Sequence, residues 1–463
     1  MKIVLPEKVT YIIDTLTQHG FEAYAVGGCV RDTMLGRIPM DWDITTSAKP
    51  EQVKELFRHT IDTGVQHGTV TVMLEHEGFE VTTYRIDGEY EDARHPKEVQ
   101  FTSNLLEDLK RRDFTINALA ISLNQENYGV LIDPFGGLQH LEERLIKTPL
   151  DPGLTFSDDP LRMMRAIRFA SQLNFQIEEN TFQAIAEYRH RLPIVSMERI
   201  MDEFNKIMLS PEPSRGIRLL DEAGLLEIFF PELTALKGVD RVQGVKHKDN
   251  FYHTLTVLDT LSLYSQDLWL RWAALLHDIG KPATKKYIQG QGWTFYGHNH
   301  VGERLVGKIF NRLKLPQNEK MKYVQKLVNL HMRPIVLSEE TVTDSAVRRL
   351  LFDAGDDIDD LMTLAEADIT SKNEEKVKRF LENFKTVRRK LKEVEEKDSI
   401  RNFQPPISGE EIIATFHLPP CKTIGDIKNA IKEAILDGII GNNYEEAREY
   451  MFKVAKELGI DSQ

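Results

Sequence analysis

The segment AYAVGGCVRD, residues 23–32, is followed nine residues later by DWDI, residues 41–44, and this pair decides the fold of the N-terminal part. The first four residues are typical of a short strand, and the residues after Gly27-Gly28 are typical of a helix start. Glycines let a backbone approach a phosphate, and the N–H groups of a helix N-terminus point at it. A Gly-Gly pair alone is more often just a turn, so its interpretation depends on the neighbouring motif.

The neighbouring motif supplies two carboxylates. On an extended strand, Asp41 and Asp43 face the same side because they are two positions apart. Two such carboxylates hold Mg²⁺ ions that clamp a triphosphate and activate a hydroxyl nucleophile. An isolated Asp-x-Asp is more often a solvated strand end, but its short distance from GGCVRD favours a metal site. Asp41 and Asp43 are therefore the candidate catalytic and Mg²⁺-binding residues.

The surrounding patterns predict an α+β fold. Residues 7–18 are helix-like, residues 69–86 alternate like two strands joined by a turn at Glu77-Gly78, and residues 119–134 look like another hairpin. From about residue 140 onward, apolar residues recur at helical spacing. We expect a mixed-sheet head at 1–138, a helical neck at 139–240, an all-α metal-binding domain at 241–371 and a helical C-terminal region at 372–463.

Two further motifs carry arginines. In RRDFTINALA, residues 111–120, Arg112 and Asp113 suit triphosphate and sugar binding, although a charged helix cap would look the same. In DDPLRMMRAIRFA, residues 158–170, Pro160 suits the first turn of a helix. Three arginines then recur on that helix and repel one another, a cost that an anionic ligand would offset: Arg162, Arg165 and Arg168. A solvated basic face is the alternative for this helix.

Histidines and aspartates gather in the second half of the chain. His277-Asp278-Ile279-Gly280 ends an apolar helical stretch. Neutral imidazole and carboxylate ligands suit a divalent transition metal. A lone histidine on a helix is usually structural, but here several lie near the ends of predicted helices. The other members of this set are His253, His298, His331 and Asp368.

The four N-terminal motifs together closely resemble class II tRNA nucleotidyltransferases, the superfamily of CCA-adding enzymes and bacterial poly(A) polymerases. This resemblance implies addition of CCA to tRNA 3′ ends from CTP and ATP, with Mg²⁺ at Asp41 and Asp43. It also implies that Asp159 and Arg162 read the base edge of the incoming nucleotide. The further nucleotide contacts that it implies are Gly28, Arg31, Arg112, Asp113, Arg165 and Arg168. The family often has Glu at the position of Asp158. The Asp158 side chain is one methylene shorter and carries the same charge.

The same superfamily leaves a poly(A) polymerase or an A-adding enzyme as the alternative. Residues 85–98 resemble the flexible loop of complete CCA-adding enzymes, which favours CCA addition. Bacterial poly(A) polymerases often end in a strongly basic tail, whereas residues 442–463 are mixed in charge.

The histidine set resembles the HD superfamily of metal-dependent phosphohydrolases, in its HDIG form. The resemblance implies that His253, His277, Asp278 and Asp368 bind a divalent metal such as Ni²⁺, Mn²⁺ or Fe²⁺. It implies that His298 and His331 hold a second metal or meet phosphate. In relatives that join these two domains, the expected substrates include 2′,3′-cyclic phosphoesters.

Composition restricts the partners and the compartment. The formal net charge of −13 excludes a protein coated all over with nucleic-acid-binding charge, so tRNA must meet a local basic face. One candidate is residues 376–392, with eight Lys or Arg against one acid, although a solvated face fits as well. Two cysteines allow no disulfide framework beyond one bridge and no cysteine metal site. With no signal peptide or membrane span, we expect a cytoplasmic enzyme with no membrane or DNA partner.

Overall fold

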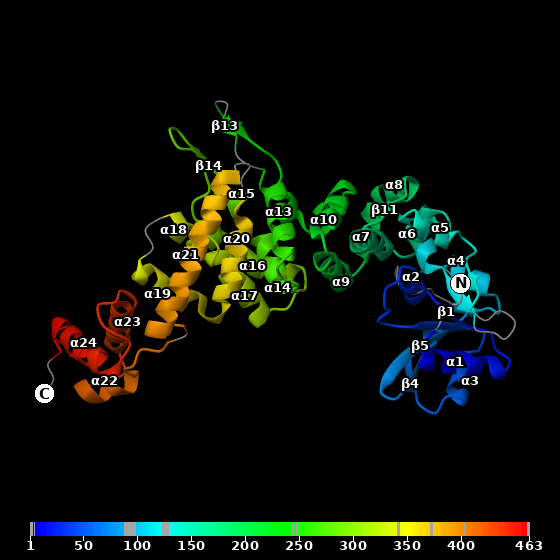
Figure 1. The fold of residues 1–463 in the computed structure, drawn as a ribbon, viewed down its shortest axis with the longest axis horizontal. Helices are drawn as coiled ribbons and strands as arrows, with labels where there is room; N and C mark the ends of the chain where they lie inside the picture. The colour runs from blue at the N-terminus through cyan, green and yellow to red at the C-terminus, as the bar shows by residue number, and fades with distance from the viewer. Residues whose placement is uncertain are drawn as a thin grey trace. The chain divides into compact units, whose positions relative to one another are not determined.

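The computed structural model describes residues 3, 5–87, 99–122, 129–242, 245–246, 249–339, 343–370, 374–401 and 403–460. Most of the loop expected at 85–98, and residues 123–128 of the expected hairpin, lie outside these described residues. The chain divides into two compact units, residues 1–234 and 235–463 (Figure 1).

A mixed seven-stranded sheet forms the centre of the first unit. Strands β2 and β5 are parallel, and every other neighbouring pair is antiparallel. This mixture confirms the predicted α+β class. In spatial order the strands are β3 (Thr60–Gly64), β4 (Thr69–Leu74), β5 (Glu77–Thr83), β2 (Asp43–Thr46), β1 (Ala23–Val26), β8 (Ala120–Ser122) and β9 (Leu131–Ile132).

Helices α1 (Glu7–Gln18) and α3 (Pro50–Leu56) pack together and against strands of this sheet. The apolar residues of α1 recur at helical spacing and are fully buried: Val9, Ile12, Ile13 and Leu16. The remaining elements of the sheet region are α2 (Gly28–Met34), η1 (Val65–His67), β6 (Arg85–Asp87), β7 (Val99–Phe101), α4 (Leu105–Lys110), η2 (Thr115–Asn117), α5 (Gly137–Glu142) and β10 (Leu145–Ile146).

The turn between β4 and β5 is not where the sequence predicted it. Leu74 pairs with Glu77, so the turn residues are Glu75 and His76, both with positive φ. Gly78 instead lies within β5, where a Cβ would come within 2.9 Å of the Thr71 side chain. The glycine that suggested a turn is therefore explained by close cross-strand packing.

The rest of the first unit is helical, as predicted. Helix α7 packs against α9 and α10, and α6 packs against α8. Pro213 is the first residue of α10, a position that suits proline. The elements are α6 (Pro152–Asp158), α7 (Leu161–Leu173), β11 (Gln176–Ile177), α8 (Glu179–Tyr188), η3 (Arg189–Ile194), α9 (Met197–Met208), α10 (Pro213–Glu222), α11 (Leu226–Phe229) and α12 (Pro231–Thr234).

The second unit is almost entirely helical. Helix α14 (Leu268–Leu276) packs against α13 (Asn250–Ser262), α17 (Glu319–Leu330) and α20 (Ile358–Asp368), and α16 (His298–Arg312) packs against α17. The other elements before α20 are β12 (Arg241–Val242), β13 (Val245–Lys246), α15 (Lys281–Thr284), β14 (Lys286–Ile288), β15 (Gly292–Thr294), α18 (Arg333–Glu339), α19 (Asp344–Ala354) and η4 (Gly355–Asp357).

Helix α21 (Glu374–Asp398) contains the basic run predicted at 376–392. Part of its charge is paired within the chain, because Arg388 contacts Glu366 at 2.8 Å and Lys390 contacts Asp344 at 3.6 Å. After it come α22 (Gly409–Phe416), α23 (Lys422–Leu436) and α24 (Tyr444–Glu457).

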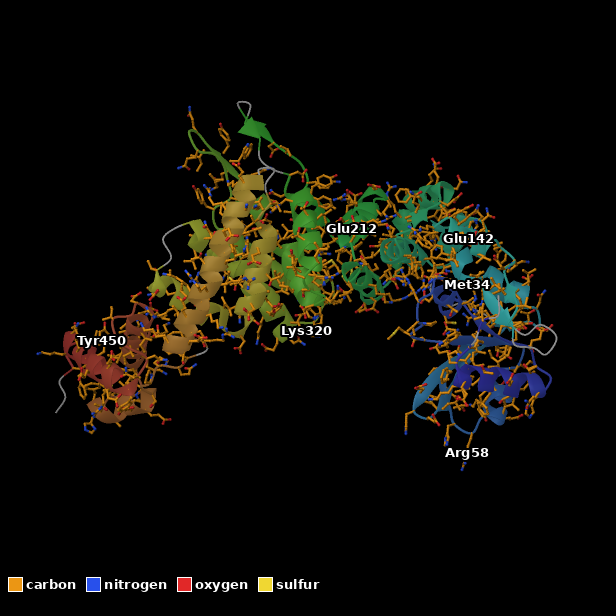
Figure 2. All side chains as sticks on the ribbon, in the orientation of Figure 1. Met34, Arg58, Glu142, Glu212, Lys320 and Tyr450 are labelled. Carbon is orange, nitrogen blue, oxygen red and sulfur yellow. The ribbon has the colours of Figure 1, made fainter. Side chains whose placement is uncertain are left out.

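Charged side chains extend outward over both units, as Arg58 and Lys320 illustrate (Figure 2). Within the described part of the chain, no helix combines the length and the apolar character needed to cross a bilayer.

Candidate functional site

The Gly-Gly turn of the first unit brings β1, Arg112 and Asp43 together. Gly27 has a φ of 84° and precedes α2, so the left-handed position falls on Gly27 rather than on Gly28. A Cβ on Gly27 would lie 3.1 Å from the Arg112 guanidinium and 3.9 Å from the Asp43 carboxylate. Arg112 Nε is buried with no hydrogen-bond partner among the described residues. The turn therefore leaves open backbone beside an acidic group and a cation.

Cys29, in the same motif, is buried beneath this turn. Its thiol donates to the Val26 carbonyl at 3.3 Å. Burial raises the pKa of the thiol to about 11, so the side chain is a neutral packing group.

Three carboxylates gather at the start of strand β2. Asp43 is the first residue of β2 and Asp41 lies two residues before the strand begins, so only Asp43 is on the strand itself. Glu80 on β5 is the register partner of Asp43. Desolvation raises the pKa of Asp43, the Arg112 charge opposes it, and Asp41 raises it further. Desolvation together with Asp43 and Asp41 also raises the pKa of Glu80. Crowded acids of this kind are a favourable setting for divalent cations.

Asp113 is buried and connects the sheet region to α7. Its Oδ2 accepts from Arg165 at 2.8 Å and its Oδ1 accepts from Asn117 at 3.0 Å. Asn117 in turn accepts from Arg31 at 2.7 Å. The structure thus brings Arg31, Asp113 and Arg165, which come from three separate motifs, into one network, and Asn117 joins them.

Asp159 lies between α6 and α7, just before the N-cap residue Pro160, and Arg162 lies in the first turn of α7. Asp159 Oδ1 accepts from the backbone of Leu161 at 3.0 Å, and its Oδ2 lies 3.1 Å from Arg199 on α9. Arg162 donates to the Arg111 carbonyl at 2.9 Å. Both side chains are partly exposed.

Arg168 lies deeper than the other arginines of α7. It is 9% exposed, pairs with Glu203 of α9, and its guanidinium lies 3.9 Å from the centroid of the Phe169 ring. Arg31 and Arg165 also lie over the same ring, at 4.9 and 5.5 Å. The repulsion expected among these arginines is therefore offset inside the protein by two carboxylates and one aromatic ring.

Sequence patterns did not single out Glu80, Phe169, Arg199 or Glu203. Glu80 carried a signal, because it alternates within a predicted strand adjacent to the acidic motif. Arg199 and Glu203 lie on a helix 35 to 40 residues from their partners, and no local pattern links them.

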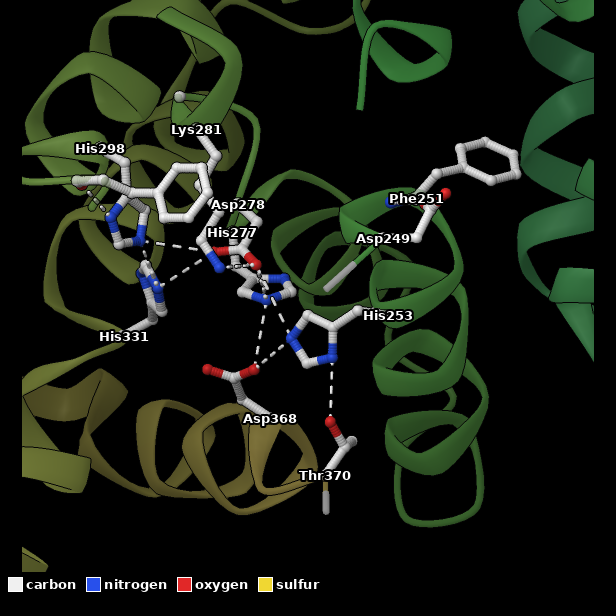
Figure 3. A network of polar contacts seen from close by, with 12 residues as sticks. Asp249, Phe251, His253, His277, Asp278, Lys281, His298, His331, Asp368 and Thr370 are labelled. Atoms are coloured by element: carbon white, nitrogen blue, oxygen red, sulfur yellow. Dashed lines mark hydrogen bonds and ion pairs between the residues drawn. The ribbon is translucent and has the colours of Figure 1, made fainter. Parts of the chain in front are cut away.

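In the second unit, six side chains from five helical segments meet at one point (Figure 3). His253 Nε2 lies 2.8 Å from Asp368 Oδ1, and His277 Nε2 lies 3.4 Å from the same oxygen. Asp278 Oδ1 lies 3.4 Å from His298 Nε2 and 3.9 Å from His331 Nε2. Every histidine and aspartate predicted for this cluster is present in it.

All four histidines are oriented in the same way. Each Nδ1 contacts an oxygen outside the cluster, at distances between 2.6 and 3.0 Å, and each Nε2 points inward. The outer contacts are the carbonyls of Ala274, Phe295 and Val328 and the hydroxyl of Thr370. An Nδ1–H that donates to a carbonyl leaves Nε2 as a lone pair for a metal ion.

Burial and charge oppose each other in this cluster. Burial disfavours the imidazolium of His277, but Asp278 and Asp368 outweigh it and raise the pKa of His277 to about 10. Burial lowers the pKa of His331 to about 4, and the His277 charge lowers it further. The cluster therefore combines carboxylates, a histidine that favours its charged form and a histidine that favours its neutral form. A bound metal cation would replace the proton on the charged histidine.

The residues fit divalent metal ions. His277 Nε2 is buried and has no hydrogen-bond partner among the described residues. Two groups each bring their ligand atoms within 4.8 Å of one another: His253, His277 and Asp368 form one, and Asp278, His298 and His331 form the other. Imidazole and carboxylate donors in these numbers suit a transition metal.

Three protein-family models match successive parts of the chain. The Poly A polymerase head domain family matches residues 23–147. The family described as "Probable RNA and SrmB- binding site of polymerase A" matches residues 174–237, and the HD domain family matches residues 250–373.

Curated relatives are named CCA-adding enzyme. The one from Bacillus licheniformis is 33% identical over 96% of this chain and 97% of its own length. The one from Anoxybacillus flavithermus is 45% identical, but the match spans 58% of this chain and 63% of that relative. The one from Geobacillus sp. is 51% identical over 49% of this chain and 55% of its own length.

Solved structures share the fold along the whole chain. The structure described as Bacillus stearothermophilus CCA-adding enzyme in complex with CTP has a TM-score of 0.72 and 28% identity, over 99% of both chains. The structure of the Thermotoga maritima CCA-adding enzyme complexed with tRNA has a TM-score of 0.60 at 21% identity, covering 98% of this chain and 96% of that one, and supports the fold alone.

Proposed function

This chain belongs to the family of CCA-adding enzymes, and from that premise we propose that it extends the 3′ end of tRNA with CTP and ATP. The observation that carries the proposal is the group of three carboxylates, Asp41, Asp43 and Glu80, beside the open Gly27 turn and Arg112. An acidic group next to a cation and open backbone is suited to a metal-bound triphosphate.

Asp41 and Asp43 are the proposed Mg²⁺ ligands, and Glu80 is a third. Bound Mg²⁺ would neutralise the triphosphate and lower the pKa of the attacking hydroxyl. Arg112 and the backbone at Gly27 and Gly28 would hold the phosphates in line with that hydroxyl. The 3′ oxygen of tRNA then forms a bond to the α-phosphorus, and pyrophosphate leaves.

Asp159 and Arg162 are proposed to read the base edge of CTP or ATP. A carboxylate that accepts and a guanidinium that donates provide the two kinds of hydrogen bond that this edge needs. Arg31 would contact the nucleotide from the Asn117 network. Asp113 and Arg168 are buried and Arg165 is bonded to Asp113, so these three residues are proposed to support nucleotide binding from the protein side.

The alternative is a poly(A) polymerase or an A-adding enzyme. One assay separates the three activities: a tRNA transcript ending at the discriminator base is incubated with Mg²⁺ and CTP, ATP or both. We expect two additions with CTP alone and a third only when ATP is also present. Long tails from ATP alone would show a poly(A) polymerase instead.

The second unit is proposed to be a phosphohydrolase that acts on phosphoesters such as 2′,3′-cyclic phosphates. His253, His277, Asp278 and Asp368 would hold a divalent transition metal such as Ni²⁺, Mn²⁺ or Fe²⁺. His298 and His331 face the other oxygen of Asp278, so they are proposed to hold a second ion or the phosphate. Bound metal would supply a hydroxide at neutral pH.

Paired variants test whether the two sites are independent. Asp41→Ala should abolish nucleotide addition and keep metal-dependent phosphoester hydrolysis, and Asp278→Ala should do the reverse. Loss of both activities in either folded variant would contradict two separate sites.

The proposed organisation has a head at 1–138, a neck at 139–240, a metal-binding domain at 241–371 and a C-terminal region at 372–463. The proposed partners are tRNA, CTP and ATP, with no DNA. A cytoplasmic location follows from this proposed role in tRNA maturation.

A further inference from the structure

Asp108 is a fully buried carboxylate next to the proposed nucleotide site. It lies on the short helix α4, outside the acidic motif and outside both arginine motifs, and its side chain is 0% exposed. A buried charge is costly unless it is paired and its acceptor sites are filled. The partners of Asp108 therefore show what its charge holds in place.

Each oxygen of the Asp108 carboxylate has two partners. Oδ1 lies 3.1 Å from Arg111 Nε and 3.4 Å from the backbone nitrogen of Arg85, at the start of β6. Oδ2 accepts from the Thr45 hydroxyl at 3.0 Å and lies 3.5 Å from a terminal nitrogen of Arg112. Burial disfavours the ionised form, but the charges of Arg111 and Arg112 outweigh it and hold the pKa of Asp108 below its ordinary value. The carboxylate is therefore ionised at neutral pH.

Oxygen Oδ2 joins the strand of the proposed metal site to the proposed phosphate-binding arginine. Thr45 lies two residues after Asp43 on β2, so the two side chains lie on the same face of the sheet. The Arg112 guanidinium has one terminal nitrogen at Asp108 and the other 3.1 Å from where a Cβ on Gly27 would lie. A continuous set of contacts therefore leads from β2 to the open backbone of the Gly27 turn.

Arg112 depends on this carboxylate for its position. Among the residues that the structure describes, Asp108 is the only acid that pairs with the Arg112 guanidinium. Arg112 Nε is buried and has no hydrogen-bond partner within the same part of the chain. A long side chain loses conformational entropy when it is ordered, and an arginine that is already paired does not lose it again when a triphosphate binds.

We propose that Asp108 is a positioning residue for nucleotide addition, which holds the Arg112 guanidinium at the Gly27 turn so that it meets the triphosphate. Asp108 acts only through Arg112, because its own side chain is buried and touches no substrate. CTP and ATP share the triphosphate, so the effect is the same for both nucleotides. This inference rests on the proposed nucleotidyltransferase function and adds a residue to that site.

The first test is Asp108→Asn, which keeps the shape of the side chain and removes its charge. The full-length protein with Mg²⁺ extends a tRNA transcript that lacks CCA, for CTP, or one that ends in CC, for ATP. We expect KM for CTP and KM for ATP to rise by the same factor, about tenfold, the size of one charge-assisted hydrogen bond. The inhibition constant of cytidine, which has no phosphate, should stay the same.

A merely destabilised protein would behave differently from a mispositioned Arg112. A smaller folded fraction lowers the apparent kcat and leaves KM unchanged. An unchanged KM for both nucleotides, or an equal rise in the inhibition constant of cytidine, would overturn the positioning role. The control is Glu107→Gln, which alters the neighbouring acid on α4, where a partly exposed ion pair joins Glu107 to Lys110. Its KM values should equal those of the wild type.

Two adjacent threonines provide a milder and closely matched pair of variants. Thr45 and Thr46 are both fully buried on β2. The Thr45 hydroxyl donates to Asp108, whereas the Thr46 hydroxyl donates to the Glu22 carbonyl at 2.6 Å. Valine keeps the branched shape and removes the hydroxyl in each case. Thr45→Val should raise KM for both nucleotides and Thr46→Val should not. Equal KM values in the two variants would overturn the proposal, even where Asp108→Asn does not fold.

A double-mutant cycle tests whether Asp108 acts through Arg112. CTP binding with Mg²⁺ is measured by calorimetry for Asp108→Asn, for Arg112→Ala and for the double variant. If Asp108 only positions Arg112, the double variant should have the Kd of Arg112→Ala, within about twofold. Effects that multiply would show independent roles and would contradict the proposal. Thr45→Val replaces Asp108→Asn in the cycle where the latter does not fold.

The calorimetric cycle also separates this inference from the proposed activity, because it needs no catalysis. If the wild type binds CTP but extends no tRNA, the nucleotidyltransferase proposal fails, yet a cycle whose effects do not multiply still supports the positioning role. If the wild type extends tRNA and the effects multiply, the positioning role fails and the activity stands. A wild type that neither binds CTP nor extends tRNA would overturn both.

Discussion

The position of Glu80 in the proposed metal site depends on the pairing register of β2 and β5. Glu80 lies opposite Asp43 because β2 and β5 run parallel, with Asp43 pairing to Glu80 and Ile44 to Val81. A shift of one residue would turn the carboxylate to the other face of the sheet. Its position beside the two aspartates depends on strand pairing across 37 residues of chain.

Glu80→Gln is expected to lower kcat for CMP addition at least tenfold, with a smaller effect on KM for CTP. The substitution removes one negative charge from the proposed cation site and keeps the shape of the side chain. Single-turnover primer extension at several Mg²⁺ concentrations measures this change in the rate of CMP addition. The control is Glu77→Gln on the same strand, whose carboxylate pairs with Lys8 instead. An unchanged kcat in Glu80→Gln would remove Glu80 from the metal site.

Asp113 provides a pH-dependent contribution to stability. Burial alone would raise its pKa, but Arg165 and Asn117 outweigh it and hold the pKa of Asp113 at about 2. Because the folded pKa lies below the ordinary value, the ionised form stabilises the fold, and this contribution is lost as the pH falls from about 4 towards 2.

Asp113→Asn should therefore lower the free energy of unfolding by about 2 kcal/mol at pH 7, with the difference from wild type narrowing below pH 4. Denaturant unfolding at a series of pH values measures this difference. Asp62→Asn, at an exposed ion pair with Lys54, should show no comparable difference. A difference that is constant down to pH 3 would contradict the ion pair as its cause.

At the scale of elements, local patterns predicted most of the helices and strands. The helix at residues 7–18 and the strand at 23–26 have the predicted bounds, and the hairpin of β4 and β5 is confirmed with its turn two residues earlier. The superfamily and the HD domain that the motifs resemble are confirmed by the family matches. These features depend on short-range spacing, which a sequence displays directly.

Tertiary partners were not predictable in the same way. The Arg199 contact to Asp159 and the Glu203 contact to Arg168 join helices that no local pattern relates. Three-dimensional packing alone specifies these contacts, although the residues themselves are visible in the sequence.

The close approach of Gly280 to α16 determines where His298 lies. A Cβ on Gly280 would come within 2.1 Å of the His298 carbonyl and 2.8 Å of the Gly302 nitrogen. Gly280→Ala should therefore push the start of α16 away, lower stability by roughly 1–3 kcal/mol and weaken metal binding. Thermal unfolding and metal titration measure both effects. Gly307→Ala on the same helix meets only a flexible glutamine side chain, so near-normal behaviour is expected there. Normal metal affinity in Gly280→Ala would contradict this role.

At the scale of the whole molecule, the histidine–aspartate cluster with its proposed metal ions joins five helical segments of the second unit. The six residues of the cluster come from α13, the end of α14, α16, the end of α17 and the end of α20. A metal present at a thousand times its Kd stabilises the folded state by about 4 kcal/mol. Stability in residues 235–463 should therefore depend on metal, whereas stability in residues 1–234 should not.

Hydrogen exchange tests this difference between the units. Removal of transition metal by dipicolinate, with Mg²⁺ kept in excess, should increase amide exchange in those five segments and leave the sheet of the first unit unchanged. The Asp278→Ala protein should show no response to the chelator. An equal increase in amide exchange in both units would mean that the chelator does not act through the histidine–aspartate cluster.

The two cysteines lie in different environments, so one of them can be labelled selectively. Cys29 is buried with its pKa raised to about 11, so almost none of it is the reactive thiolate at neutral pH, whereas Cys421 is exposed at the start of α23. A maleimide dye should therefore attach once, to Cys421, as intact mass would show, and Cys421→Ser should abolish labelling. The native chain thus offers a fluorescent reporter in its C-terminal helices, distant in sequence from every proposed catalytic residue, for following tRNA as it arrives and departs.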